Sequence, residues 1–449
     1  MFLSSNFTQG WHWHLPSLLS KQTTESTRYY YSDDKTFEKS LDVYKPIFAS
    51  DKEKEKAAQQ DLPITILVVG SGWVGHRAFV YAQTSWWNSS GPKTVASLGQ
   101  TCVCIRHRGA FCVLPPALVL ARYLAVLLAV LLAFCQNWEF AVAFTALTAL
   151  FLCLLALGGR GSAKFEDMLD DVAQALKWIH SHPDLLRIGE TQTPMRAQLW
   201  TCSWPSSLEE ENEKEGEDHN NYVPSASPTS HSNSYDSESS EEESPLQHSS
   251  NNKQSFVFGG YSSGGHVAAT LLQTPELFSK YNLPDPETFF DGILMISGVL
   301  AVRPETVSMN NGETTISTPK APTWLIQFVM QTVWGPEAVD QIPSPLTLLQ
   351  DKQYCPRLPH LLVGCRNELF GLSWLDIFFC SQAYCEAVQL STQQPAKHIQ
   401  VNSDHWNILN SRALREALRE ELPRLNMKHQ GTTVQSQPLA KRTKSAQIQ

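Results

Sequence analysis

Gly260-Tyr261-Ser262-Ser263-Gly264 is the most informative stretch of this chain, because it fits the pattern G-x-S-x-G and lies between a strand-like run and a helix-forming run. The apolar, strand-like run 255–258 precedes it, and the helix-forming run 265–272 follows it. Strand, tight turn and helix in this order expose a serine as a nucleophile. The glycines allow the sharp turn, and the helix N-terminus stabilises negative charge. Ser262 is the predicted nucleophile, and an ordinary Gly/Ser-rich turn is the alternative.

A downstream histidine is the predicted base. His405 follows the strand-like run 398–401 and precedes a helical stretch, so that its loop could reach a serine hydroxyl. The pKa of histidine lies near working pH, which lets it take and return a proton. The chain has 14 histidines, so position rather than presence selects His405. A surface histidine without a catalytic role is the alternative.

The third member of a catalytic triad is a carboxylate on the loop after the strand-like run 359–364. Glu368 is the predicted acid, although Asn367 stands where an aspartate is expected. Asp376, at the expected start of the next helix, is the second candidate. A solvated loop carboxylate is the other interpretation of Glu368.

A small-residue loop follows the β-branched strand 64–69 and predicts an oxyanion hole. Backbone N–H groups of such a loop can turn toward a developing oxyanion. The predicted donors are those of Gly70, Ser71, Gly72 and Ser263. A nucleotide-binding loop is disfavoured, because neither G-x-G-x-x-G nor a Lys-Ser/Thr ending is present.

These pieces together resemble one family. The run 69–73 is similar to the H-G-G-G-W loop of α/β-hydrolase esterases, with Val69 and Ser71 replacing a histidine and a glycine. The run 260–266 is similar to their G-x-S-x-G-G-H elbow, and 170–179 and 292–299 resemble the helix before it and the strand after it. The resemblance points to hormone-sensitive-lipase-like carboxylesterases, kynurenine formamidase-like hydrolases and isoprenylcysteine methylesterases. It implies a serine hydrolase.

Two apolar runs, 113–134 and 138–157, predict a membrane-anchoring helical hairpin. Each is about long enough to cross a hydrocarbon core of roughly 30 Å. Arg106 and Arg108 precede the pair, and Arg160 follows it, so both ends are expected to face the cytosol. A buried soluble hairpin is the alternative. Endoplasmic reticulum or Golgi is the expected location, and a lipid ester is the expected substrate.

The segment 201–252 is acidic, rich in serine and poor in apolar residues, so it predicts a disordered insertion that could bind a kinase or another protein. It also carries much of the formal net charge of −9, which argues against nucleic-acid binding. The ten cysteines show no CxxC pair, which favours a reduced compartment. No metal site and no cofactor are expected.

The sequence therefore predicts an α/β-hydrolase fold: a mostly parallel sheet with helices on both faces, interrupted by the hairpin 113–157 and the insertion 201–252. The hydrolase domain is expected over 61–425, with a candidate cap at 304–343. A polar N-terminal region (1–60) and a disordered tail (426–449) flank it. The predicted function is hydrolysis of a carboxylic ester through an acyl-enzyme. An amidase or formamidase, and an inactive binding protein, are the alternatives.

Overall fold

A computed structural model describes nine stretches of the chain: 24–59, 62–73, 86–110, 163–188, 254–309, 312–334, 339–350, 354–368 and 376–425. The chain divides into two units, 1–192 with 254–449, and 193–253. The second unit lies outside the described residues, as do the predicted hairpin, acidic insertion and tail, which therefore stay predictions. None of the helices in the described stretches is long and apolar enough to cross a membrane.

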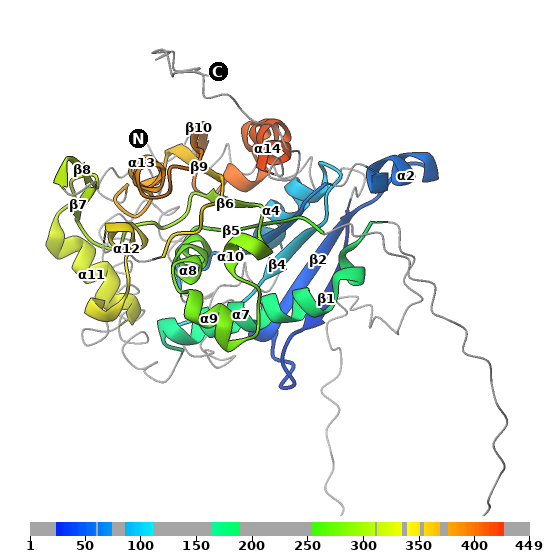
Figure 1. The fold of residues 1–449 in the computed structure, drawn as a ribbon, viewed down its shortest axis with the longest axis horizontal. Helices are drawn as coiled ribbons and strands as arrows, with labels where there is room; N and C mark the ends of the chain where they lie inside the picture. Colours follow the sequence, from blue (N-terminus) through cyan, green and yellow to red (C-terminus); the bar gives the residue numbers. More distant parts are fainter. Residues whose placement is uncertain are drawn as a thin grey trace, which may run out of the picture. The chain divides into compact units, whose positions relative to one another are not determined.

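An eight-stranded sheet forms the centre of the first unit, in the order β1-β2-β4-β3-β5-β6-β9-β10 (Figure 1). Its strands are β1 (Thr24–Tyr30), β2 (Ser40–Pro46), β3 (Ile64–Val68), β4 (Cys102–Ile105), β5 (Phe256–Tyr261), β6 (Gly292–Ile296), β9 (His360–Asn367) and β10 (Ala396–Asp404). The strands from β4 to β10 pair in parallel, and the β1–β2 hairpin pairs antiparallel at one edge. This arrangement fits the predicted α/β-hydrolase fold.

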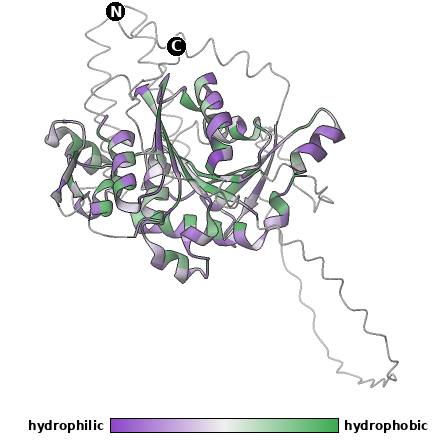
Figure 2. Cartoon of the chain, turned by 45° about the horizontal axis from the view of Figure 1, so that its top comes forward, coloured by the Kyte–Doolittle hydropathy of each residue, from purple (hydrophilic) through white to green (hydrophobic). Residues whose placement is uncertain are grey.

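Helices pack on both faces of the sheet (Figure 1). One face is covered by α7 (Phe165–Ser181), α8 (Ser263–Leu272), α12 (Pro345–Gln350) and α13 (Ser381–Thr392), and the other by α4 (Trp86–Ala96) and α14 (Arg412–Leu425). Figure 2 shows hydrophobic residues along the central strands and alternating character on the helices. In α7 the apolar residues recur at helical spacing and are buried, as the sequence predicts.

The remaining described elements are shorter or peripheral. They are η1 (Phe37–Lys39), α2 (Asp51–Gln59), η2 (Pro183–Leu186), α9 (Pro275–Lys280), α10 (Pro286–Phe289), β7 (Thr306–Met309), β8 (Thr314–Ser317), α11 (Thr323–Trp334), η4 (Val339–Gln341) and η7 (Ile408–Asn410). The β7–β8 hairpin and α11 occupy the segment predicted as a cap. Their role as a cap stays a prediction.

The N-terminal region corrects the sequence analysis. Residues 24–46 were expected to be loosely ordered and outside the domain, but β1 and β2 extend the sheet. Asp42 of β2 is buried because the guanidinium groups of Arg106 and Arg28 pair with it. This ion pair joins residues far apart in sequence, so the local pattern around Asp42 reads as polar although the strand is buried.

Two fully buried histidines predict an acid-sensitive fold. Burial lowers the pKa of His266 and of His360 to about 4, and backbone hydrogen bonds offset only part of this. In the unfolded chain their pKa is about 6.5. The unfolded state therefore binds more protons between these values, and the free energy of unfolding falls as pH drops from about 6.5 to about 4. Above about pH 6.5 the contribution of the two uncharged histidines to the free energy of unfolding is fully present.

Urea unfolding of wild type and His360→Asn at pH 7 and pH 5 checks this. Asparagine retains a donor for the Leu358 carbonyl, which His360 contacts through Nδ1 at 2.8 Å, but it does not titrate. The variant should lose less stability than wild type between the two pH values. An equal loss in both proteins would contradict the prediction.

Candidate active site

The turn between β5 and α8 places Ser262 at the carboxyl end of the parallel sheet. Ser262 has φ 54° and ψ −130°, a backbone conformation that residues other than glycine rarely adopt. The neighbouring glycines permit the turn: a Cβ on Gly260 would lie 2.5 Å from the carbonyl carbon of Gly264, and one on Gly264 would lie 2.6 Å from that of Val69. The motif thus folds as the expected elbow, with the serine held in a strained conformation.

His405 lies immediately after β10 and reaches the Ser262 hydroxyl. Its Nε2 is 3.0 Å from the Ser262 Oγ. The Asp404 carboxylate accepts the backbone N–H groups of Trp406 and Asn407, both at 2.9 Å, and so shapes the turn that carries the imidazole. Tyr261, one residue before the nucleophile, donates its hydroxyl to the His405 carbonyl at 2.6 Å and stacks on its ring.

Glu368 completes the arrangement. Its Oε2 lies 2.9 Å from His405 Nδ1. Its Oε1 accepts the Ser297 hydroxyl at 3.0 Å and the Cys365 backbone N–H at 2.9 Å, and the side chain is only about 6 % exposed. These contacts fix both carboxylate oxygens, and they hold the imidazole in the tautomer that leaves Nε2 free to accept the serine proton.

Asp376, the second candidate acid, has no described contact with His405. It lies on a turn before α13, and burial and then the nearby Glu368 raise the pKa of its carboxyl. The structure therefore brings together Ser262, His405 and Glu368. Tyr261 and Ser297 support these residues but were not predicted from the sequence, although Ser297 directly follows β6 at the same edge of the sheet.

The loop predicted to form the oxyanion hole, residues 70–73 (hereafter the oxyanion loop), lies against the elbow. A Cβ on Gly70 would lie 2.5 Å from the Ser262 Cβ, so glycine is required there. The Ser71 and Trp73 backbone N–H groups both donate to the Ser263 hydroxyl oxygen, at 2.8 and 3.2 Å. In this conformation the Ser71 N–H is therefore engaged. Within the described stretches, the N–H groups of Gly72 and Ser263 have no partner.

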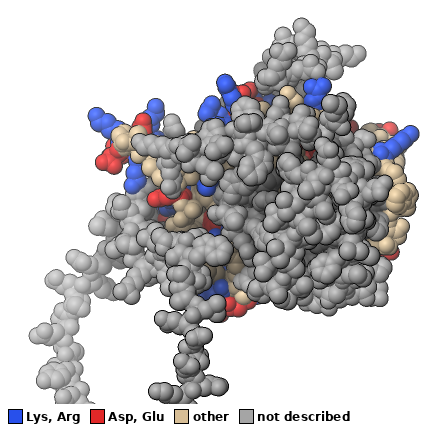
Figure 3. All heavy atoms as spheres, turned by 180° about the vertical axis from the view of Figure 1, so that it is seen from behind, with Lys and Arg blue, Asp and Glu red and all other residues tan. Residues whose placement is uncertain are grey.

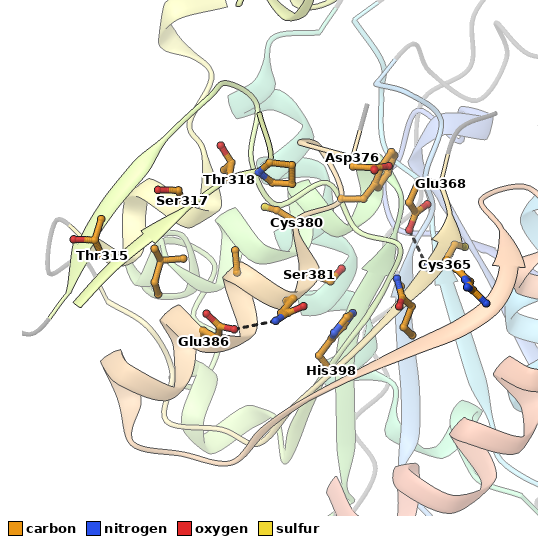
Figure 4. Close-up of a pocket in the computed structure, with 18 residues that line it drawn as sticks. Thr315, Ser317, Thr318, Cys365, Glu368, Asp376, Cys380, Ser381, Glu386 and His398 are labelled. Atoms are coloured by element: carbon orange, nitrogen blue, oxygen red, sulfur yellow. Dashed lines mark hydrogen bonds between the residues drawn. The ribbon is translucent and has the colours of Figure 1, made fainter. Parts of the chain in front are cut away.

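A cavity of about 460 Å³ lies beside Glu368 (Figure 4). Glu368 and Asp376 lie at one side of it, and a hydrogen bond between Gln382 and Glu386 of α13 lies further along the wall. The lining includes neither Ser262 nor His405. We therefore do not assign this cavity to the substrate.

The charged side chains suggest no further site in the described stretches. No three His, Cys, Asp or Glu side chains there are grouped as a metal ion would need. On the face drawn in Figure 3, basic and acidic side chains of the described residues lie close together rather than apart. Ion pairs such as that of Arg424 with Glu420 and Glu421 show the same interspersion at the end of α14.

Comparison with known proteins adds distant similarities only. No protein-family model matches the chain, and no curated protein matches it. Esterase B of Lactobacillus rhamnosis is 11% identical over 94% of this chain and 93% of its own, with a TM-score of 0.46. A Pyrobaculum calidifontis esterase is 11% identical over 93% and 92%, with a TM-score of 0.43. The metagenomic carboxylesterase EstE1 is 14% identical over 94% and 95%, with a TM-score of 0.44. Likenesses this remote carry no argument about activity.

Proposed function

We propose that this protein is a serine hydrolase that cleaves carboxylic esters through an acyl-enzyme. The observation that carries the proposal is the continuous chain from Ser262 Oγ to His405 Nε2 at 3.0 Å and from His405 Nδ1 to Glu368 at 2.9 Å. A hydroxyl, an imidazole and a buried carboxylate in this order make an activated nucleophile.

The chemistry follows from these contacts. Ser262 Oγ attacks the ester carbonyl carbon while His405 Nε2 takes its proton, and the Nδ1–H of His405 stays bonded to Glu368. When the tetrahedral intermediate collapses, the imidazolium returns the proton to the departing alcohol, which leaves the acyl group on Ser262. Water then attacks with His405 as base, and the carboxylic acid leaves. Backbone N–H groups beside Ser262 stabilise the oxyanion in both steps.

A substrate panel tests the proposal and distinguishes an esterase from an amidase and from an inactive binding protein. Purified full-length protein should hydrolyse short-chain p-nitrophenyl esters faster than matched aryl formamides. Faster formamide cleavage would assign an amidase that uses the same triad. No turnover, and no labelling by a fluorophosphonate, would favour the inactive binding protein. Val69 in place of the loop histidine favours that alternative, and the contact of Glu368 with His405 at 2.9 Å supports the hydrolase instead.

We further infer that the segment 113–157 anchors this domain in a membrane. The described residues before and after this segment, 109–110 and 163, lie side by side and form what we call the insertion base. There the Ala163 N–H donates to the Gly109 carbonyl at 3.2 Å. The adjacent Ala110 N–H donates to the Trp73 carbonyl at 2.6 Å, so the insertion base adjoins the oxyanion loop. An excursion that starts and ends at one point supports a hairpin, and its position favours a lipophilic ester such as an acylglycerol, an acetylated lipid or a prenylcysteine methyl ester.

Arg106 and Arg108 do not form the basic flank of the hairpin that the sequence predicts. Arg106 is fully buried against Asp42, and Arg108 pairs with Asp171 at 2.9 Å. They are structural cations of the domain rather than free flanking charges. The cytosolic orientation is supported instead by the free cysteines Cys102, Cys365 and Cys385.

Fractionation tests the anchor. Full-length protein expressed in cells should stay with the membrane pellet after an alkaline carbonate wash. A variant in which a short Gly-Ser linker replaces 111–162 should move largely to the soluble fraction and keep its fluorophosphonate labelling, because the insertion base stays closed. Full-length protein that washes off the membrane would contradict the proposal.

A further inference from the structure

We propose that Ser263 and Trp73 form a clamp that holds the oxyanion loop in its catalytic position, and that both are positioning residues. The inference rests on the proposed function and deepens it, since it assigns which backbone N–H groups bind the oxyanion. Neither side chain belongs to the triad, and each acts through the loop 70–73.

Ser263 provides the first half of the clamp. The residue is fully buried and begins α8, so the helix fixes its position. Its hydroxyl oxygen accepts two loop donors, Ser71 N–H at 2.8 Å and Trp73 N–H at 3.2 Å. A hydroxyl oxygen has two acceptor sites, and here both are filled by one loop. The loop is thereby bonded directly to the residue that follows the nucleophile.

Trp73 provides the second half. Its indole N–H donates to His266 Nδ1 at 2.9 Å, and His266 Nε2 lies 2.8 Å from the Pro343 carbonyl oxygen. Burial lowers the pKa of His266 to about 4, so at neutral pH the imidazole is uncharged and Nδ1 can accept. Trp73 is buried and has φ 63°, a strained value for a side chain of this size. Its fixed indole helps to hold that backbone conformation.

The clamp leaves a defined pair of donors. It engages the N–H groups on both sides of Gly72, whose φ of 61° lies in the left-handed region. The hydrogen bonds of Ser71 and Trp73 therefore fix the orientation of the Gly72 N–H between them. The Ser263 N–H lies at the N-terminus of α8. An oxyanion donor must lie about 2.7–3.1 Å from the developing charge, so a small loop shift lowers the rate without weakening ground-state binding.

Steady-state kinetics on full-length Ser263→Ala and Trp73→Phe test the clamp. Each variant should lower kcat by about 10- to 100-fold while KM changes less than about threefold, since loss of a whole oxyanion donor costs about 10²- to 10³-fold. Affinity for an aryl trifluoromethyl ketone should fall in parallel with kcat/KM. The matched controls are Ser279→Ala at an exposed position of α9 and Trp178→Phe on α7, where the ring stacks on His182, and both should keep wild-type kinetics.

Hydrogen exchange gives a readout that does not depend on turnover. Peptides covering 64–73 should exchange faster in Ser263→Ala than in wild type, because the Ser71 and Trp73 amides lose their acceptor. Ser263→Cys, which keeps a weaker acceptor, should lie between the two, and it serves if the alanine variant fails to fold. Unchanged kcat, or unchanged exchange of this peptide, would overturn the clamp. A wild type without hydrolase activity would refute the proposed function instead, and exchange would still decide on the clamp.

Discussion

Ser262→Ala should lower kcat for ester hydrolysis by about 10⁴- to 10⁶-fold, the range seen when a triad nucleophile is removed. The change deletes only Oγ, the atom that forms the acyl bond and whose hydroxyl donates to His405 Nε2 at 3.0 Å. It should also abolish covalent labelling by a fluorophosphonate. The free energy of unfolding should change little, because alanine keeps the Cβ and the backbone conformation of the turn.

The neighbouring serine makes the control for this experiment demanding. Ser263 lies one position further along but cannot act as the nucleophile in this geometry, because its hydroxyl oxygen accepts hydrogen bonds from two N–H groups of the oxyanion loop. Ser263→Ala should therefore retain labelling, only more slowly, whereas Ser262→Ala should show none. Mass spectrometry of the labelled peptide assigns the site directly. Label on Ser263 in the wild type would refute the assignment of Ser262.

Glu368→Gln should lower kcat by about 10³- to 10⁴-fold at neutral pH, as expected when the triad carboxylate becomes an amide. The amide keeps the shape and can still accept from Ser297 and Cys365 through one oxygen. Its NH₂ group then faces His405 Nδ1, which favours the tautomer with hydrogen on Nε2. That tautomer cannot take the proton of Ser262.

Asp376→Asn is the matched control for this substitution. Both carboxylates line the same cavity, but only Glu368 contacts His405. The Asp376 variant should therefore change kcat by less than about threefold, since a charge without a direct contact contributes little. If Asp376→Asn were the more damaging change, the acid would be misassigned and the second candidate of the sequence analysis would be correct.

The parts of the site that sequence could predict are those encoded locally. The G-x-S-x-G spacing and the adjoining strand predict the elbow, because glycine is needed wherever backbone meets backbone, as at Gly260 and Gly264. The six parallel strands could be predicted from short apolar runs. His405 and Glu368 could be placed only as residues after strands, since their meeting depends on the parallel order of β9 and β10.

The parts that sequence could not predict depend on contacts across the fold. β2 was missed because Asp42 looks polar until Arg106 is known to pair with it. The sequence could not show which N–H groups are available to an oxyanion. The Ser71 N–H is already bonded to the Ser263 hydroxyl, and this contact depends on the position of the Ser263 side chain in the fold. The same limit misled the interpretation of Arg106 and Arg108 as membrane-flanking charges.

The contact between Gly109 and Ala163 bears on how the sheet folds when the segment between these two residues changes in length. The residues on each side, which follow β4 and precede α7, meet through the 3.2 Å hydrogen bond from Ala163 to Gly109, and the adjacent Arg108 pairs with Asp171 of α7 at 2.9 Å. The entropy lost in closing a flexible loop grows only with the logarithm of its length, at about 0.6 kcal/mol for each doubling. Insertions and deletions at this one position should therefore cost the sheet little, so that a segment of very different length could join Gly109 to Ala163 while β4 and α7 keep their places.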